Sequence, residues 1–406
     1  MPQPLPFAVA RRDPAYAVIE MFGGDNNLAD FVTTDLQEAM DGLGHDGALL
    51  ALVDYASRPS EVLELSGGKA RRLAQPGEIN TGDGETLAEF LARALVSYDP
   101  SVPVAIGFWD HGSGVTDEED PDEAIVAMVV DGPPPPTPRP RRLRSAGRLF
   151  AGAPKNDFEA EAMLHDDTNR GVLTTREAGS VLSAALRRAG RGRVRAIFSD
   201  TCLNGMIEVL HEFAPAADCV IGSEALEPGD GWDYTAFLNG LRAPYDGAAW
   251  GKAAVAAYEA CYRDRTGEHP CTMGAFLSAN QVVSAFRALV DAAHAGGAAG
   301  FAILDRARAM ATSFDQRDCY DLIEFAGHLP AAGATGTLAA AGSALDQAAR
   351  AARVANTVMG ADVARAQGIS FWFPSTKEEL RRTGATYRHL AFDRETGWTA
   401  YLAQHR

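Results

Sequence analysis

Short apolar runs alternate with amphipathic segments along the first half of the chain. The apolar runs that are typical of buried strands cover residues 16–22, 48–54, 104–109, 194–198 and 218–222. Helical spacing covers residues 27–40, 86–98, 174–188 and 203–213, and the third of these opens on a capping box, Thr174 to Glu177. Because strands that alternate with helices form right-handed crossovers, this pattern predicts an α/β/α sandwich with a mostly parallel central sheet.

The pattern changes after about residue 278. Ala-rich helical segments cover 280–296, 300–313 and 335–358, and one late apolar strand covers 369–374. We therefore predict an α/β core over residues 1–278 and a mainly helical C-terminal subdomain over 279–406 that packs on it.

One long insertion, residues 116–157, interrupts the alternation between two predicted strands. Six of the seven residues in Asp117–Glu123 are acidic, and a stretch rich in proline and arginine follows. Such a composition cannot bury a core, so we expect an exposed loop. A loop of this length either has a role in function or only links the two strands.

Composition and charge exclude several classes of partner. The chain has 406 residues and a formal net charge of −17, which argues against binding to nucleic acid or to an anionic membrane. Its five cysteines are widely spaced and form no C-x-x-C pair, so we expect reduced thiols. The start of the sequence shows no secretory signal pattern and no window of about 18 apolar residues exists, so we expect a cytoplasmic protein.

Two strand ends carry candidate chemistry. Phe108–Gly112 places His111 after an apolar run, and the strand 194–198 leads to Cys202 at a predicted helix start. If the strands are neighbours, the two side chains meet at the carboxyl edge of the sheet. A helix start and a nearby imidazole both favour a thiolate nucleophile, and the N–H groups of Gly112 and Cys202 can form an oxyanion hole. Taken alone, each residue also fits a structural role.

The order of several motifs resembles the clostripain family of cysteine peptidases, which have a caspase-like fold. The resemblance runs through most of the chain. It is carried by Asp25-Asn26-Asn27-Leu28 with Asp35–Met40, Trp109–Gly114, Asp200–Gly205 with Glu208, Ser223-Glu224 with Pro228–Tyr234, and the later Tyr320–Leu322 and Gly368–Pro374.

The resemblance implies an endopeptidase that cuts proteins after arginine or, less well, lysine. Cys202 would be the nucleophile that forms a thioester acyl-enzyme, and His111 the general acid and base. Asp200 and Asp230 fall where the family places the carboxylates that bind a guanidinium in the S1 pocket. Each also has a structural alternative, Asp200 as a helix cap and Asp230 as a turn residue.

The family also matures by cleavage between its histidine and cysteine motifs. We therefore expect a zymogen that is activated by a cut in the 117–157 loop, made by the enzyme itself or by an upstream protease. The candidate cleavage sites are Arg139, Arg141, Arg142, Arg144, Arg148 and Lys155. A passive linker that any trypsin-like enzyme would nick is the alternative.

Metal binding has weaker support in the sequence. Some members of the family use calcium, and Asp157, His165-Asp166-Asp167 and Asp25-Asn26-Asn27 are rich in oxygen ligands. None of these stretches has the spacing of an EF-hand, and no H-E-x-x-H motif occurs, so the sequence assigns no metal site and no certain cofactor.

Two other functions remain open at this stage. One is a catalytically silent caspase-like scaffold that binds a basic partner through its acidic surface. The other is a cysteine hydrolase or transpeptidase of the same fold with a different substrate, which would not need the Asp200 and Asp230 carboxylates.

Overall fold

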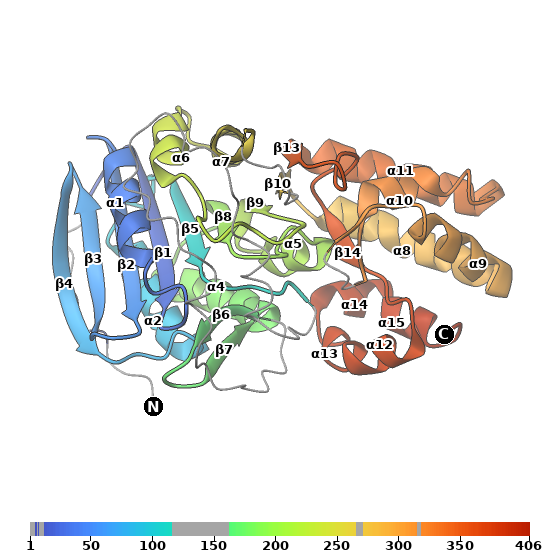
Figure 1. Ribbon diagram of the computed structural model, residues 1–406, viewed down its shortest axis with the longest axis horizontal. Helices are drawn as coiled ribbons and strands as arrows, with labels where there is room; N and C mark the ends of the chain where they lie inside the picture. The colour runs from blue at the N-terminus through green and yellow to red at the C-terminus, as the bar shows by residue number, and fades with distance from the viewer. Residues whose placement is uncertain (1–4, 6, 8–11, 116–161, 265–270, 315–317) are drawn as a thin grey trace.

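The computed structural model describes residues 5, 7, 12–115, 162–264, 271–314 and 318–406 (Figure 1). The insertion and all six candidate cleavage sites, Arg139, Arg141, Arg142, Arg144, Arg148 and Lys155, lie outside the described residues, as does Asp157. Within the described part of the chain, every helix is too short or too polar to cross a lipid bilayer.

A nine-stranded sheet forms the centre of the described structure, in the order β13-β10-β9-β8-β5-β1-β2-β3-β4 (Figure 1). Its strands are β1 (Tyr16–Gly24), β2 (Gly47–Tyr55), β3 (Ser60–Ser66), β4 (Lys69–Gly77), β5 (Val104–Trp109), β8 (Val194–Asp200), β9 (Ala217–Gly222), β10 (Cys271–Leu277) and β13 (Arg353–Met359). The five strands from β9 to β2 run parallel, and two antiparallel strands flank them on each side.

Strand order reverses beside β1, which has β2 on one side and β5 on the other. In open parallel sheets, such a switch point opens a crevice at the carboxyl ends of the strands, where ligands bind. The two motif-bearing strands, β5 and β8, are neighbours there.

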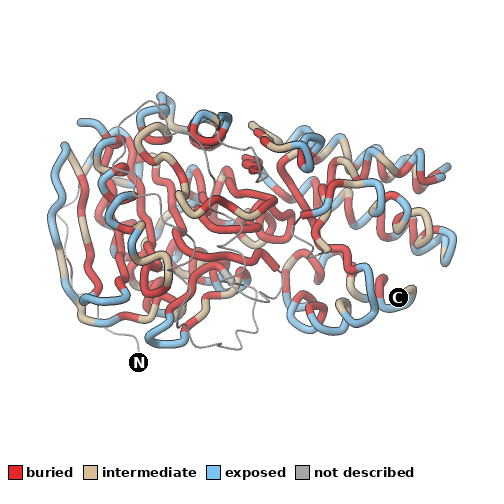
Figure 2. Tube along the Cα trace, viewed as in Figure 1, coloured by how far each residue is buried: buried red, intermediate tan, exposed pale blue. Residues whose placement is uncertain are grey.

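Helices cover both faces of the sheet and bury alternate residues of each strand. Ala17, Ile19 and Met21 of β1 pack in the same core as α2 (Gly84–Val96), α4 (Thr175–Ala189) and α5 (Ile207–Phe213). Tyr16, Val18 and Phe22 pack with α1 (Val32–Gly42), α6 (Tyr234–Gly240) and α7 (Gly247–Tyr262) on the opposite face. The central strands are therefore buried on both sides, while β4 is exposed along much of its length (Figure 2).

The C-terminal region is mainly helical and shares a core with the α5 side of the sheet. Its helices are α8 (Asn280–Ala295), α9 (Gly297–Arg308), α10 (Leu322–His328), α11 (Gly336–Ala352), α12 (Lys377–Arg382), α13 (Gly384–Tyr387), α14 (Ala391–Thr396) and α15 (Trp398–Leu402). A small sheet joins β11 (Ser313–Phe314), β12 (Cys319–Asp321) and β14 (Ser370–Trp372), and β6 (Ala162–Asp166) pairs with β7 (Gly171–Thr174).

The predicted fold class is confirmed: a mostly parallel mixed sheet lies between helices, with a helical C-terminal region. The capping box at Thr174 is present, with Glu177 bonding back to the Thr174 backbone. The predicted helix over 335–358 is partly wrong, because α11 ends at Ala352 and the chain continues as β13. Since β13 pairs with β10, the C-terminal stretch supplies a strand to the central sheet, and the division at residue 278 stays a prediction.

Two predicted helices begin later than their apolar spacing suggests. Residues before Val32 form turns, in which the Asn26 side chain accepts a hydrogen bond from the N–H of Leu28. Residues before Ile207 do not form a helix, because the Gly205 N–H donates to the Ser223 carbonyl and the Gly205 carbonyl accepts from the Ser370 N–H. Local turn bonds thus delay the start of α1, whereas bonds to distant segments replace the helical ones before α5.

Candidate active site

The ends of β5 and β8 bring the histidine and the cysteine together. Trp109 pairs with Asp200 in the parallel register, and the Asp110 N–H donates to the Asp200 carbonyl at 3.3 Å. His111 and Cys202 therefore leave the sheet at the same level, and both line one cavity of about 40 Å³.

Three of the predicted site residues line this cavity, and two lie beside it. The lining residues are Leu28, Asp35, Trp109, Asp110, His111, Asp200, Thr201, Cys202, Glu227, Pro228, Gly229 and Gly231. Asp230 is half-buried and lies between the lining residues Gly229 and Gly231, outside the described lining itself. A Cβ atom at Gly112 would lie 2.8 Å from the Cys202 carbonyl oxygen, so only glycine allows this approach of the two backbones.

His111 is held in its neutral form by its surroundings. Its Nε2 lies 2.6 Å from the Asn27 Oδ1. Because this amide oxygen can only accept a hydrogen bond, the bond selects the tautomer that carries its proton on Nε2 and its lone pair on Nδ1. Burial and the neighbouring His165 lower the pKa of His111 to about 3. At neutral pH the imidazole can therefore accept a proton, but it does not form an ion pair with a thiolate in the resting site.

Asp110 fixes the loop around the histidine. Its Oδ1 accepts from the His111 N–H at 2.6 Å and from the Asn26 Nδ2 at 2.7 Å, and its Oδ2 accepts from the His165 N–H at 2.6 Å. One carboxylate thus ties together the ends of β1, β5 and β6.

Cys202 is 6% exposed and lies in a turn, not at a helix start. The expected effect of a helix N-terminus on this thiol is wrong, because Leu203 has a φ of 59° and α5 begins only at Ile207. The Glu227 N–H lies 3.4 Å from the Cys202 Sγ instead. A donor aimed at sulfur favours the thiolate form, so a backbone N–H takes over part of the expected role.

A second acid, Glu227, shares the cavity with Asp200, and sequence reasoning missed it. Asp200 accepts from the Trp232 N–H at 3.2 Å and from the Glu227 carboxyl, and Glu227 accepts from the Trp232 Nε1 at 2.8 Å. Burial raises the pKa of Asp200 to about 7 and that of Glu227 well above its ordinary value, since the two carboxyls also repel one another. The pair thus holds a proton on Glu227, which donates to Asp200.

A buried tyrosine connects this pair to a third acid. The Tyr234 hydroxyl lies 2.7 Å from the Glu20 Oε1 and 3.1 Å from the Asp200 Oδ2. Burial raises the pKa of Glu20 to about 8, so Glu20 is protonated near neutral pH and the phenol can donate to Asp200. Asp200 therefore receives more hydrogen bonds that stabilise a negative charge than the other acids of this group.

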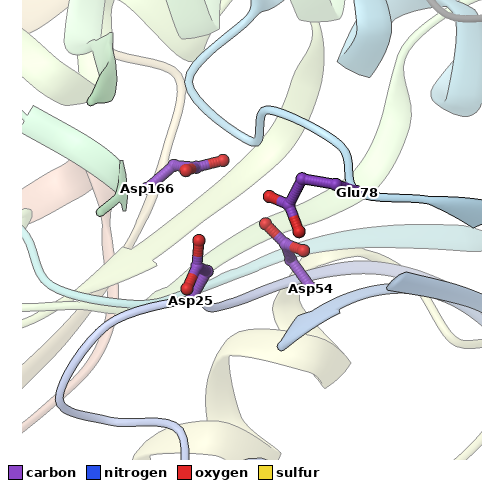
Figure 3. Close-up of side chains that lie close together, drawn as sticks. All are labelled: Asp25, Asp54, Glu78 and Asp166. Atoms are coloured by element: carbon purple, nitrogen blue, oxygen red, sulfur yellow. The ribbon is translucent and has the colours of Figure 1, made fainter. Parts of the chain in front are cut away.

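A separate group of carboxylates lies at the same edge of the sheet, around β1, β2 and β6. Asp25, Asp54, Glu78 and Asp166 point toward one another there (Figure 3). Asp25 and Asp166 come from the oxygen-rich stretches noted in the sequence, while Asp54 and Glu78 were not expected. This acidic cluster could hold a metal ion.

The sequence matches the family model described as the clostripain family over residues 21–129 and 151–325. This match covers more than half of the chain and includes both strand ends described above. The chain belongs to the clostripain family. Its family is that of the C11 cysteine peptidases. No curated protein matched the sequence significantly.

Solved structures of clostripain-family proteases share the fold at low sequence identity. A secreted C11 cysteine protease from Bacteroides thetaiotaomicron, solved with an irreversible peptide inhibitor, has a TM-score of 0.66 at 15% identity and covers 95% of this chain and 99% of its own. An inactive zymogen C11 protease from Parabacteroides distasonis has a TM-score of 0.64 at 15% identity, with 97% and 99% coverage. A secreted C11 protease from B. thetaiotaomicron called iotapain has a TM-score of 0.64 at 12% identity, with 96% and 99% coverage.

Proposed function

We propose that this clostripain-family chain is an endopeptidase that cleaves proteins after arginine and, less efficiently, after lysine. The observation that carries the proposal is the shared cavity of His111, Cys202 and the buried carboxylate Asp200. A guanidinium entering the cavity replaces internal donors as the partner of Asp200, and Asp230 approaches it from the adjoining loop. A scaffold that only binds a basic partner would not need a thiol beside that carboxylate.

The proposed reaction uses His111 as base and then as acid. Its Nδ1 takes the proton of the Cys202 thiol while Sγ attacks the scissile carbonyl carbon, and the N–H groups of Gly112 and Cys202 stabilise the resulting oxyanion. His111 then gives the proton to the leaving amine as the C–N bond breaks, which leaves a thioester. Water attacks the thioester, with His111 again as base, and releases the acid product and the thiol.

The proposed resting form is a zymogen, activated by a cut among Arg139, Arg141, Arg142, Arg144, Arg148 and Lys155 in the 117–157 loop. The Parabacteroides relative described as an inactive zymogen has the same fold, which adds support by analogy only.

A cytoplasmic location is part of the proposal and rests on the cysteines. All five, Cys202, Cys219, Cys261, Cys271 and Cys319, are buried thiols. Two of the structural relatives are described as secreted, so location needs its own measurement by cell fractionation.

The deciding experiment compares purified wild type with Cys202→Ala. We expect wild type to be cut within residues 139–155 by intact mass, and to hydrolyse a fluorogenic Arg amide faster than the Lys amide and not the Asp amide. We expect Cys202→Ala to do neither, with a loss of at least about 1,000-fold. If wild type stays intact and inactive, limited trypsin nicking followed by the same assay decides between a zymogen and a non-catalytic scaffold.

A further inference from the structure

The turn between β1 and α1 places one side chain directly against the proposed catalytic histidine. Asn27 lies in this turn, and its Oδ1 is 2.6 Å from the Nε2 of His111. His111 is buried and Asn27 is half-buried. The neighbouring Leu28 lines the cavity with Cys202, whereas Asn27 is not among the described lining residues. Asn27 therefore contacts the histidine from outside the space that a substrate would enter.

Hydrogen bonds hold this turn and the histidine loop at a fixed spacing. The Asn26 Nδ2 donates to the Gly23 carbonyl at 3.0 Å and to the Asp110 Oδ1 at 2.7 Å. The same Asp110 oxygen accepts from the His111 N–H at 2.6 Å. One carboxylate oxygen thus joins the residue before Asn27 to the backbone of the histidine that Asn27 contacts.

The strand before the turn also fits this contact. A Cβ atom at Gly23 would overlap the Asp110 Oδ2, so a larger residue there would displace the Asp110 carboxylate. β1 and β5 pair in parallel, with Phe22 opposite Trp109, so the two loops leave the sheet side by side. The contact with the histidine therefore depends on the register of the sheet and not on the turn alone.

An amide oxygen suits only one state of the ring nitrogen beside it. It accepts a hydrogen bond and cannot donate one, so Nε2 of His111 carries the proton and Nδ1 keeps the lone pair. Since the thiol proton goes to Nδ1 in the proposed reaction, this tautomer is the reactive one. An amide with its nitrogen toward the ring would place the proton on Nδ1 and block that step.

The contact also becomes stronger while His111 is charged. Burial and the neighbouring His165 lower the pKa of His111 to about 3, so a charged ring is costly in this site. Once Nδ1 has taken the thiol proton, both ring nitrogens carry hydrogen, and the Nε2 bond to Asn27 becomes a charge-assisted one. The bond returns to its neutral form when His111 gives the proton to the leaving amine. Asn27 thus stabilises the charged ring more than the neutral ring, which is what raises a rate.

We propose that Asn27 is a positioning residue that sets the tautomer of His111 and stabilises its imidazolium. This proposal rests on the proposed function, because that function makes the ring a base and then an acid. Asn27 touches neither the substrate nor the sulfur in this scheme. Its loss should therefore lower kcat and leave KM nearly unchanged.

The first test reads the tautomer by NMR and does not need peptidase activity. Full-length Cys202→Ala is isotope-labelled at its histidine ring nitrogens, and the His111 signals are assigned by their loss when His111→Gln is added. At pH 8 we expect the proton on Nε2 in this parent and a mixture of tautomers after Asn27→Ala. Asn27→Asp keeps an oxygen acceptor of the same size, so it should keep the pattern of the parent.

The second test measures kcat and KM for the Arg amide with the activated enzyme. We expect Asn27→Ala to lower kcat at least about tenfold and to change KM less than about threefold, because a hydrogen bond to a charged group is lost. Asn27→Asp should recover most of kcat at pH 8. Asn280→Ala, at the exposed first residue of α8, is the matched control and keeps both constants.

The two tests distinguish failure of this proposal from failure of the proposed function. If wild type hydrolyses no amide even after the loop is nicked, the proposed function fails, while NMR still decides whether Asn27 sets the tautomer. A parent with its proton on Nδ1, or an Asn27→Ala protein that keeps the Nε2 pattern, overturns the proposal. In an active enzyme, an unchanged kcat in Asn27→Ala, or an equal loss in Asn27→Asp, also overturns it. If Asn27→Ala does not fold, Asn27→Leu, which has a similar size and no acceptor, replaces it with the same expectations.

Discussion

Two groups of buried acids lie at the same edge of the sheet, and they are stabilised in different ways. In the pair Asp200 and Glu227, Trp232 and Tyr234 donate to Asp200 and the Trp232 indole donates to the Glu227 Oε2, although the buried Glu227 Oε1 has no partner among the described residues. In the group around Asp54, its charged neighbours Asp25, Glu78 and Asp166 are all acidic and raise its pKa further. The first group lines the cavity beside Cys202, whereas the second is a separate acidic cluster that could hold a metal ion.

The difference follows from how protons are distributed. Glu227 and Glu20 have pKa values raised by burial, so each can keep a proton and donate it toward the network that ends at Asp200. One negative charge then remains in the cavity, next to Cys202. Under the proposed arginine specificity, a guanidinium would bind here reversibly, because Asp200 keeps its hydrogen bonds when the substrate leaves.

Asp200→Asn tests the charge of the substrate pocket and has the largest expected effect. Loss of a buried partner for a guanidinium costs about 3 kcal/mol, so we expect kcat/KM for an Arg amide to fall about 100-fold. The isosteric citrulline amide carries no charge, and its slow hydrolysis should change less than about threefold. Steady-state kinetics on both substrates measures the difference; an equal loss on both would show that Asp200 supports the fold of the site and does not select charge.

The pH dependence of KM gives the next largest effect. Because burial raises the pKa of Asp200 to about 7, its carboxylate is the main form above pH 7 and is lost as the pH falls. We expect KM for the Arg amide to rise by about tenfold per pH unit below pH 7. His111, with a pKa lowered to about 3, does not titrate between pH 5 and 8, so it does not produce this change.

Asp200→Asn is the control for that profile. The variant should show a KM for the Arg amide that is flat across the same range, since the titrating carboxylate is gone. A rise in KM that persists in the variant would assign the titration to another group.

The sequence predicted the parts of this molecule that depend on local pattern. The runs at β1, β2, β5, β8 and β9 are apolar because both of their faces are buried, so each was predicted. The edge hairpin was missed because β4 is polar and largely exposed, and because glutamates interrupt the apolar residues of the mostly buried β3. His111 and Cys202 follow β5 and β8, and they lie close together because these neighbouring parallel strands end at one edge of the sheet.

The missed site residues depend on contacts that no local pattern encodes. Glu227 is a single acid in a loop, which no local pattern marks. Its place in the site depends on the hydrogen bond from the Trp232 indole to its carboxyl and on the contact of its N–H with the Cys202 Sγ. Asp54 reads as the last residue of a buried strand, and only the folded sheet brings Glu78 and Asp166 to it. The late start of α5 has the same origin, since hydrogen bonds that join Gly205 to Ser223 and Ser370 override helical spacing there.

Glu227→Gln tests whether Glu227 carries a proton, and it has the smallest expected effect. If Glu227 is a protonated acid that donates to Asp200, an amide of the same size keeps that hydrogen bond and the charge of the cavity. We expect kcat/KM for the Arg amide at pH 8 to change by less than about threefold, whereas Glu227→Ala should cost more than about tenfold because Asp200 loses a donor. A large loss in Glu227→Gln at pH 8 would mean that Glu227 is ionised and binds the substrate cation directly.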